Sequence, residues 1–599
     1  MATLALPFRL PRVNPGAALG FAAIWAFLLL FVLYPLTRIF YDAFTTQDGA
    51  FTLGNFVDFF TDAYYLGALW KSMLLGIGAV ITTSVLGIAV AVLLLRYEFP
   101  CRNLFSYLTM LPLIMPPLVG VLGFVFILGR AGTVNVVLMD YFGMQQPINF
   151  MYGLQGVLLV ETLHLFPMIT LSILDALSKV DPALEEAAQG MGAKGWRRFR
   201  DITLPLTTPG YVSGALLVFI WTFADFITPL VVGVQDVLAA QAYLNIVQFI
   251  DLRLFKMGIV ISALLVMLAI VFVLAARQYV AIKDYSSLSY TKVERRRLSP
   301  VKRWLAVGFL AALMFISFLP HIGVTLAAFG RGWSLTPFPL EYTTAFFTRV
   351  SIETPKFIIN SFLYCGLAVA VRLLIGVPMA WIMSRTRAPG RNTMDALTTL
   401  ILAIPGTAIG IAYIRAFHFP LPVIDIALTS MWIILPLVLA VRRLPYTVRG
   451  SYSSLLLVHK SMEEAAENVG ATKMRTFRDI TVPLVWKGIL VGALFSFITS
   501  LQEASAVVFL TLGGWETIPF GIFTFYIAGS QNEAAALGFI LIVVAAISIA
   551  RPSTMTMIPD RVSGAANISS APSTINTPAT TLRCTFDMTQ AWHSDLAAV

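Results

Sequence analysis

Residues 185–206 read EEAAQGMGAKGWRRFRDITLPL, and residues 463–484 read EEAAENVGATKMRTFRDITVPL. Aligning residues 184–206 with 462–484 gives 14 identities in 23 positions at a constant offset of 278. A second match lies upstream at an offset of 289, and it places Ser72, Gly87, Arg96, Pro100, Arg102, Asn103 and Pro116 on Ser361, Gly376, Arg385, Pro389, Arg391, Asn392 and Pro405. The chain is therefore an internal repeat of two related halves.

The composition of the chain indicates a membrane protein. Of its 599 residues, 58% are hydrophobic and 12% are charged, and the mean hydropathy is +0.82. An average soluble domain is about one-quarter charged, so a soluble fold could not hide this much apolar surface. Long apolar runs recur, and about 20 helical residues cross a hydrocarbon core of about 30 Å. A β-barrel would show short alternating segments instead. We expect an all-α integral membrane protein.

We expect about twelve transmembrane helices, six in each half. The apolar runs lie near residues 17–39, 69–95, 104–129, 153–176, 209–232 and 256–279, and near 303–328, 359–384, 395–417, 422–441, 487–510 and 534–550. Because each half has six spans, matching loops face the same side of the membrane. The halves are then parallel copies related by an axis along the membrane normal.

Charged residues between the runs set the expected orientation. Residues 40–68 carry four Asp and no Lys or Arg, whereas Arg96, Arg102, the segment 280–302 and both quoted stretches are basic. The positive-inside rule places the basic loops in the cytoplasm. The first run is too long for a signal-peptide core, so we expect a multi-pass membrane protein with both termini cytoplasmic. Short basic clusters explain the net charge of +10, and no nucleic-acid partner is expected, because that would need a continuous basic face.

The repeat divides the chain into four parts. Residues 1–282 form the first repeat, 283–302 a basic cytoplasmic linker, 303–550 the second repeat and 551–599 a tail. The tail is rich in Ser, Thr, Pro and Ala and has no helical periodicity, which is typical of disorder. An equally open interpretation is that the tail is non-native and follows the loss of the natural reading frame.

Each quoted stretch has the pattern of a short exposed helix. Asp181-Pro182 suits a helix start, and Ser461 with Glu464 has capping-box spacing. Acidic residues in the first turn suit the helix dipole, small residues allow close approach of another body, a glycine suits a left-handed turn, and a proline closes the segment. These positions are Glu185, Glu186, Ala187, Ala188, Gly192 and Pro205 in the first copy, and Glu463, Glu464, Ala465, Ala466, Gly470 and Pro483 in the second.

The alternative is an amphipathic element that rests on lipid headgroups. That alternative explains the basic residues of the two stretches. It does not explain why acidic, small and glycine positions keep one spacing in two otherwise diverged halves. We therefore expect the stretches to dock a protein partner.

The same spacing resembles the EAA loop of binding-protein-dependent ABC importer permeases. The pattern is met at Glu186-Ala187-Ala188, Gly192 and Leu204-Pro205, and again in the second copy, where Val482 replaces the leucine before Pro483. The resemblance covers about residues 16–550. Within it, FADFITPLVVG at residues 223–233 is similar to a segment of the ferric-iron importer branch, and long fused permeases for 2-aminoethylphosphonate also look similar.

The resemblance implies a type I importer permease fold, a transporter subunit rather than an enzyme, and two copies of a cytoplasmic ABC ATPase, one per loop. It also implies a location in the bacterial inner membrane, a periplasmic substrate-binding protein and alternating access driven by ATP. No catalytic residue and no bound cofactor are expected, since ATP is used by the partner. The chain has no G-x-x-x-x-G-K-[ST] motif, and Gly190–Gly195 lacks the Lys-Ser/Thr step.

Ionisable residues inside the spans are candidates for function. Asp225 and Glu503 correspond at the offset of 278 and are expected in the outer part of the fifth and eleventh spans. They are predicted to line the translocation path or its gate, and the alternative is a pair of carboxylates hydrogen-bonded near a helix end. Glu161 and His164 share a helix face, where a local structural pair is favoured.

No metal site is expected. His418 and Asp425 flank two prolines in a short turn, and Cys101, Cys365 and Cys584 show no ligand spacing. A twelve-span secondary transporter of the major facilitator kind would share the parallel halves, but it would not need the repeated loops. A membrane enzyme would need a clustered nucleophile, base or metal set, which the sequence does not show.

Overall fold

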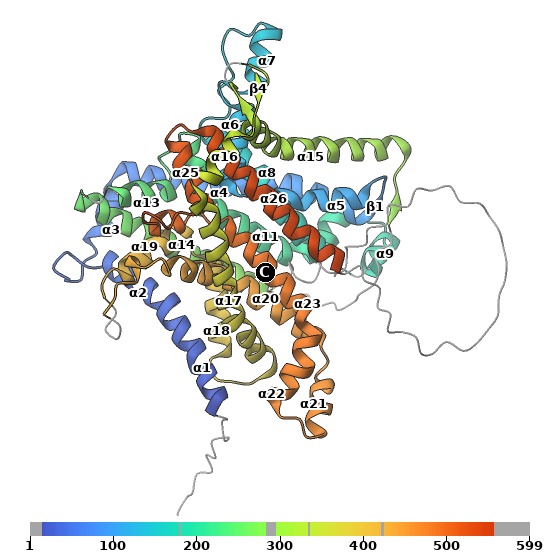
Figure 1. The fold of residues 1–599 in the computed structure, drawn as a ribbon. Helices are drawn as coiled ribbons and strands as arrows, with labels where there is room; N and C mark the ends of the chain where they lie inside the picture. The colour runs from blue at the N-terminus through green and yellow to red at the C-terminus, as the bar shows by residue number, and fades with distance from the viewer. Residues whose placement is uncertain are drawn as a thin grey trace, which may run out of the picture.

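The computed structural model describes residues 15–178, 180, 182–193, 195–248, 250–282, 295–333, 336–420 and 425–555. Within these ranges the chain is almost entirely helical (Figure 1). Most of the expected linker and the tail from residue 556 lie outside the described residues. The last helix continues to Met555, past the expected tail boundary at residue 551.

The first half contains the helices α1 (Pro15–Leu28), η1 (Leu29–Leu33), α2 (Tyr34–Ala43), α3 (Gly54–Thr61), α4 (Ala63–Arg96), α5 (Arg102–Met110), η2 (Leu111–Ile114), α6 (Pro117–Leu128), α7 (Thr133–Phe142), α8 (Leu154–Ser178), α9 (Pro182–Gly190), α10 (Trp196–Arg198), η3 (Phe199–Thr203), α11 (Leu204–Ala224), α12 (Ile227–Val231), α13 (Leu238–Val247) and α14 (Leu252–Ile282).

The second half contains α15 (Pro300–Phe329), α16 (Ala345–Ile352), α17 (Pro355–Arg385), α18 (Arg391–Ala403), α19 (Gly406–Phe417), η4 (Leu428–Ser430), α20 (Ile434–Leu457), α21 (Lys460–Asn468), α22 (Lys473–Thr476), η5 (Phe477–Thr481), α23 (Val482–Leu501), α24 (Val507–Leu510), α25 (Ile518–Ile527) and α26 (Gln531–Met555). Strands β1 (Tyr97–Glu98) and β2 (Arg296–Arg297) pair in parallel, and β3 (Gly330–Arg331) pairs antiparallel with β4 (Glu341–Tyr342).

The number of apolar spans is lower than the twelve expected. Among the described residues, ten helices are long and apolar enough to cross a membrane, and the bent pair α18–α19 would be an eleventh. Helix α20 takes the place of the expected span 422–441, but it begins at Ile434 and carries Arg442, Arg443 and Arg449. Because of these three charges, α20 is not counted among the helices that are apolar enough to cross a membrane, although most of its residues are buried.

Several expected spans are interrupted. The run 104–129 is divided into α5, η2 and α6 around Pro112 and Pro116, because proline removes a helix hydrogen bond and restricts the preceding residue. The run 395–417 bends by 111° between α18 and α19, next to Pro405. The runs 209–232 and 487–510 end as helices at Ala224 and Leu501. Periodicity alone does not reveal these breaks.

Apolar stripes on the spans face outward. On α4, Trp70, Leu74, Ile77, Ile81 and Val85 are all exposed and follow one another at intervals of three or four residues. The opposite side of α4 packs on α8 and α11. A continuous exposed apolar stripe on a packed helix is a surface suited to lipid rather than water.

The two halves interlock through their first spans. Helix α2 packs against α19 of the second half, and α15 packs against α6 of the first. At the second contact a Cβ on Gly123 would lie 2.1 Å from the carbonyl oxygen of Pro320, so only glycine permits this approach. At the first contact, Arg415 Nε donates to the Asp42 carboxylate at 2.5 Å. The first span of each half therefore packs into the helix bundle of the other half.

The quoted loops lie on one side of this bundle. In Figure 1, α9 lies at the right of the bundle and α21–α22 at its bottom, whereas α7 lies at the top and α13 at the left. Both loops therefore project away from the elements that follow the helix breaks.

Candidate coupling loops and translocation path

Each quoted stretch folds as a short helix, a glycine turn and a longer helix. Gly192 has φ +89° and Gly470 has φ +93°, which confirms the predicted left-handed turns. The turns are closed by bonds from Ala193 N to Ala188 O at 2.9 Å and from Ala471 N to Ala466 O at 3.0 Å. Glycine adopts this backbone at no steric cost, which explains its place at the helix end.

The helix boundaries differ in detail from those expected. Helix α9 begins at Pro182, while Asp181 lies outside the described residues. Helix α21 begins at Lys460, so Ser461 lies inside the helix and the expected capping box does not form. Pro205 and Pro483 do not close their segments, since a π-helical turn of identical sequence, FRDIT, leads directly into α11 and α23. Both prolines lie in the first turn of those helices.

The two loops expose matching surfaces. Glu186 and Ala187 are exposed, as are Glu464 and Ala465, whereas Ala188 and Ala466 are buried against the chain. Large apolar side chains are also exposed at equivalent positions, namely Leu184 and Met191 in the first loop and Met462 and Val469 in the second. Each loop thus presents an acidic and apolar face that has the chemistry of a docking surface.

Glu185 and Glu463 face inward, away from that surface. Arg96 at the end of α4 forms an ion pair with Glu185, with Nη1 donating to Oε2 at 3.0 Å, and Thr203 Oγ1 donates to Oε1 at 2.7 Å. In the second half Arg385 Nε lies 3.2 Å from Glu463 Oε2, and Thr481 Oγ1 donates to Oε1 at 2.9 Å. The internal repeat aligned Arg96 with Arg385, but the sequence analysis did not predict that these arginines contact the loops.

The surroundings of Glu185 fix its charge state. Burial alone would raise the pKa of this carboxyl, but the hydrogen bonds from Arg96 and Thr203 and the positive charge of Arg96 outweigh burial. The net effect lowers the pKa of Glu185 below its ordinary value of 4.5. The first loop is therefore held by a carboxylate that stays charged at neutral pH.

Asp225 lies at a helix break rather than inside a span. It follows the last residue of α11, and its carboxylate accepts hydrogen bonds from Ile227 N at 3.0 Å and Thr228 N at 3.2 Å. These bonds cap the short helix α12. The carboxyl of Glu161 on α8 lies next to Asp225, and its Oε2 accepts from Thr222 Oγ1 at 3.4 Å. Glu161 thus contacts α11 and its C-terminal end, and the local pair expected between Glu161 and His164 is replaced by this contact.

Glu503 occupies the equivalent break, with different neighbours. It is buried, accepts from Ala506 N at 3.3 Å, and pairs with Arg442 at 3.1 Å and Arg443 at 2.7 Å. Arg372 of α17 is fully buried nearby in the same half and donates to Ser500 Oγ at 2.7 Å. The offset of 278 places Arg442 on His164, which the sequence could have shown. The first half is thus acidic at this depth and the second half basic.

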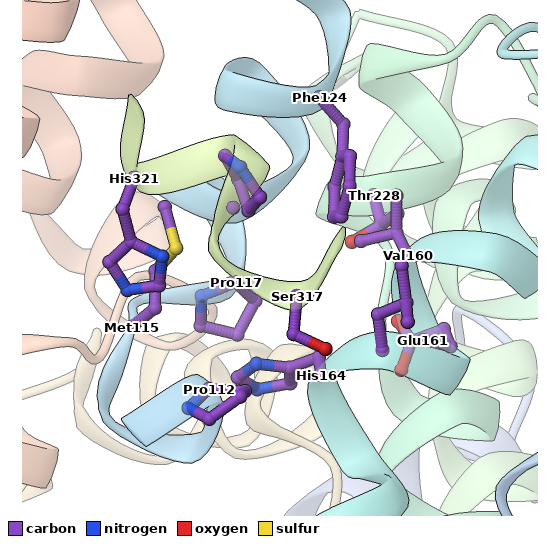
Figure 2. Close-up of a pocket in the computed structure, with 13 residues that line it drawn as sticks. Pro112, Met115, Pro117, Phe124, Val160, Glu161, His164, Thr228, Ser317 and His321 are labelled. Carbon is purple, nitrogen blue, oxygen red and sulfur yellow. The ribbon is translucent and has the colours of Figure 1, made fainter. Parts of the chain in front are cut away.

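A small cavity of about 20 Å³ lies beside Glu161, between α6, α8, α12 and α15. Figure 2 shows Pro112, His164 and Ser317 grouped at one end of it and Glu161 close to Val160. His164 hydrogen-bonds the backbone of Pro112. His164 Nε2, Thr228 Oγ1, Ser317 Oγ and His321 Nδ1 find no hydrogen-bond partner among the described residues. A cavity of this size can hold one water molecule, which such atoms would bind.

No group of three His, Cys, Asp or Glu side chains within the described ranges is placed to hold a metal ion. His418 ends α19, and Asp425 follows the residues 421–424 that lie outside the described part.

Four aromatic rings close the space between the halves next to the first helix break. Phe226 and Tyr243 of the first half have centroids 5.0 Å apart. Tyr243 lies 5.6 Å from Phe509 and 5.9 Å from Phe523 of the second half. Phe226 also contacts both of these rings, at 6.2 and 6.4 Å. We name these four residues the aromatic cluster, and the sequence analysis did not identify it.

The chain matches one family model twice. The model describes the binding-protein-dependent transport system inner membrane component, and it matches residues 83–283 and 373–559. The chain belongs to this family. It is therefore a multi-pass inner-membrane permease of the ABC importer class. The two matches confirm the two related halves that the internal repeat predicted and the permease fold that the resemblance implied.

Curated relatives of this permease extend the comparison. A ferric transport system permease protein of Actinobacillus pleuropneumoniae is 29% identical over 86% of this chain and 75% of its own length. A molybdenum transport system permease protein of Escherichia coli K12 is 37% identical over 26% of this chain and 69% of its own length. A Salmonella choleraesuis protein named for 2-aminoethylphosphonate transport is 28% identical over 39% of this chain and 82% of its own length.

Proposed function

We propose that this permease couples to two copies of a separate cytoplasmic ABC ATPase, one at each quoted loop. The observation that carries the proposal is the equal geometry of α9 and α21. Both helices end in a left-handed glycine, expose the same Glu-Ala pair, and expose large apolar side chains at matching positions. Two equal docking faces on one side of a bundle suit two copies of one partner.

The remaining features follow from this arrangement. ATP would be bound and hydrolysed by the ATPase, so this chain needs no cofactor of its own. The two loops and both termini would be cytoplasmic, in agreement with the basic loops. A periplasmic substrate-binding protein would deliver the solute at the opposite side, where the helix breaks and the aromatic cluster lie.

The aromatic cluster supports an alternating-access cycle. It joins both halves, so any rotation of one half against the other must separate its rings. ATP-driven approach of the two loops would open the path outward, and hydrolysis would restore the contact. Asp225 and Glu503 lie just after the spans that end near this cluster, and we propose that they border the gate.

We infer that the solute is ferric iron. The similarity to a ferric transport permease extends over most of the chain, and the paired carboxyls Glu161 and Asp225 offer oxygen ligands for a cation. The runner-up is 2-aminoethylphosphonate. It is favoured by three guanidinium groups of the second half, the buried Arg372 and the largely buried Arg442 and Arg443. Arg442 and Arg443 share one carboxylate, Glu503.

The test is co-purification of an ATPase with the solubilised chain, followed by uptake in vesicles. The variant Gly192→Asp with Gly470→Asp strains both left-handed turns and adds charge to both docking faces. The control is Gly143→Asp with Gly529→Asp, which imposes a similar backbone strain, at φ +70° and +80°, outside the quoted loops. Neither control position has a neighbouring atom within 4 Å of an added Cβ.

We expect the ATPase to co-purify with the native chain and the control and to be lost from the loop variant. Vesicles that contain the complex should then accumulate ferric iron and not 2-aminoethylphosphonate when ATP and the binding protein are supplied. Absence of any ATPase from the native chain would reject the coupling proposal. Uptake of the phosphonate alone would reject only the choice of ferric iron.

A further inference from the structure

The coupling loops are tied to the spans by one cluster in each half. The first cluster joins Arg96, Glu185 and Thr203, and the second joins Arg385, Glu463 and Thr481. We name them the Arg–Glu–Thr clusters. Each takes one residue from the end of a long span, one from the loop helix and one from the π-helical turn before the next span. The same three roles recur in both halves, although the halves have diverged.

These clusters are the main polar attachment of very short helices. Helices α9 and α21 have nine residues each, and isolated helices of fewer than about 12 residues are marginal in water. Most side chains of α9 and α21 are exposed, apart from the buried alanine and the inward glutamate of each. A loop attached only by its alanine could tilt independently of the spans when a partner pushes it.

The bonds are of a kind that resists tilting. Arg96 uses both terminal nitrogens on the two oxygens of Glu185, and charge-assisted bonds of this fork geometry fix orientation as well as distance. In the second half Arg385 also donates to the carbonyls of Leu455 at 2.8 Å and Val458 at 2.6 Å, at the end of α20. The second loop is therefore joined at one point to α17, to the end of α20 and to η5, the π-helical turn before α23.

We propose that the Arg–Glu–Thr clusters are the rigid links that pass the displacement of each loop to its spans. Glu185 and Glu463 are positioning residues in this view, and they do not contact the ATPase, which meets Glu186 and Glu464. The inference rests on the proposed coupling to an ATPase. It predicts that a broken cluster uncouples transport from ATP hydrolysis while the ATPase stays bound.

The experiment compares variants of the full complex in vesicles. One variant replaces the cations, Arg96→Gln with Arg385→Gln. A second variant exchanges the two charges within each cluster. It carries Arg96→Glu and Glu185→Arg in the first cluster, and Arg385→Glu and Glu463→Arg in the second. A third removes only hydroxyls, Thr203→Val with Thr481→Val. The matched control is Arg197→Gln with Arg475→Gln, which removes the same charge from exposed arginines of the same loops. Within the described part of the chain, the ion pairs of these arginines are with Asp201 and Asp479.

Three quantities are measured, namely ATPase affinity, ATP hydrolysis rate and solute transported per ATP. We expect the cation variant to keep its ATPase affinity and its hydrolysis while transport per ATP falls about tenfold, within the usual range of coupling between sites. The charge exchange should recover part of that loss, and the hydroxyl variant should lose less. The control should match the native chain.

The outcomes distinguish a failure of this inference from a failure of the proposed coupling to an ATPase. If the native chain binds no ATPase, the coupling proposal itself fails. If the native chain binds but the cation variant loses ATPase affinity to the extent of Gly192→Asp with Gly470→Asp, the clusters belong to the docking site and the inference is wrong. Unchanged transport per ATP also overturns it. If the cation variant does not fold, the hydroxyl variant and the charge exchange decide the question by the same three quantities.

Discussion

Glu185 and Glu186 are neighbours in the chain but have opposite surroundings. Successive helix residues point about 100° apart, so one of two adjacent glutamates can face the spans while the other faces solvent. Glu185 meets Arg96 and Thr203, and Glu186 is exposed. The sequence shows both acids and their helix, but the choice of inward face depends on where Arg96 lies after α4 and α8 have packed.

The low pKa of Glu185 leads to a prediction about pH. A carboxyl whose pKa is lowered in the folded state stabilises its contact fully at any pH above its ordinary, unfolded-state pKa. That stabilisation is lost only as the pH falls through the lower pKa of the folded state. Hydrogen-exchange protection of α9 should therefore stay constant between about pH 8 and pH 5, after correction for intrinsic exchange, and fall below about pH 4. Glu185→Gln should lower protection throughout and remove the step. A decline centred near pH 6 in the native chain would contradict this prediction.

The helix breaks after α11 and α23 show what an element-scale pattern misses. Apolar character continues through residues 209–232 and 487–510, so hydropathy predicts unbroken spans. The breaks form because side chains bind the backbone there, with Asp225 accepting from the start of α12 and Glu503 accepting from Ala506. Repeats, glycine turns and most spans could be predicted, since they depend on local spacing. Arg442 and Arg443 meeting Glu503 could not, since that contact needs α20 and α23 packed together.

The two equivalent carboxylates should differ in their contribution to stability. Glu503→Gln leaves the largely buried guanidinium groups of Arg442 and Arg443 without a carboxylate, and the loss of one partner of a buried ion pair costs about 3–5 kcal/mol of unfolding free energy. Asp225→Asn keeps an oxygen acceptor for the cap of α12 and should cost less than about 1 kcal/mol. Denaturant titration of the purified protein in mixed micelles measures both. Equal losses in the two variants would show that the ion pairs of Glu503 add nothing.

At the scale of the whole molecule, the halves hold each other. Helix α2 packs on α19 and α15 packs on α6, with Tyr413 OH donating to Phe31 O at 2.7 Å across the first contact. The buried core continues from one half into the other, and the aromatic cluster bridges them. The linker is therefore not what keeps the halves together.

A divided chain tests this interlocking. Residues 1–282 and 303–599, made as separate polypeptides in one cell, should co-purify in equal amounts, because the contacts of α2 with α19 and of α15 with α6 do not need a covalent bond. Asp42→Ala with Arg415→Ala in the divided pair should weaken the association, and Lys71→Ala with Asp236→Ala, an ion pair inside one half, should not. Recovery of each piece alone would show that the fold depends on the linker.

The interlocking also affects how the protein is made. The partner of Asp42 on α2 is Arg415 on α19, which is 373 residues later in the chain. At a synthesis rate of about 5–20 residues per second, α2 waits roughly 20–75 s in the bilayer before α19 emerges from the ribosome. During that interval the only guanidinium described beside Asp42 is that of Arg38, one turn earlier on the same helix. The apolar face of α2 then has only lipid or the insertion machinery to cover it. The first span to enter the membrane thus gains its full set of packing partners only when the second half has been synthesised.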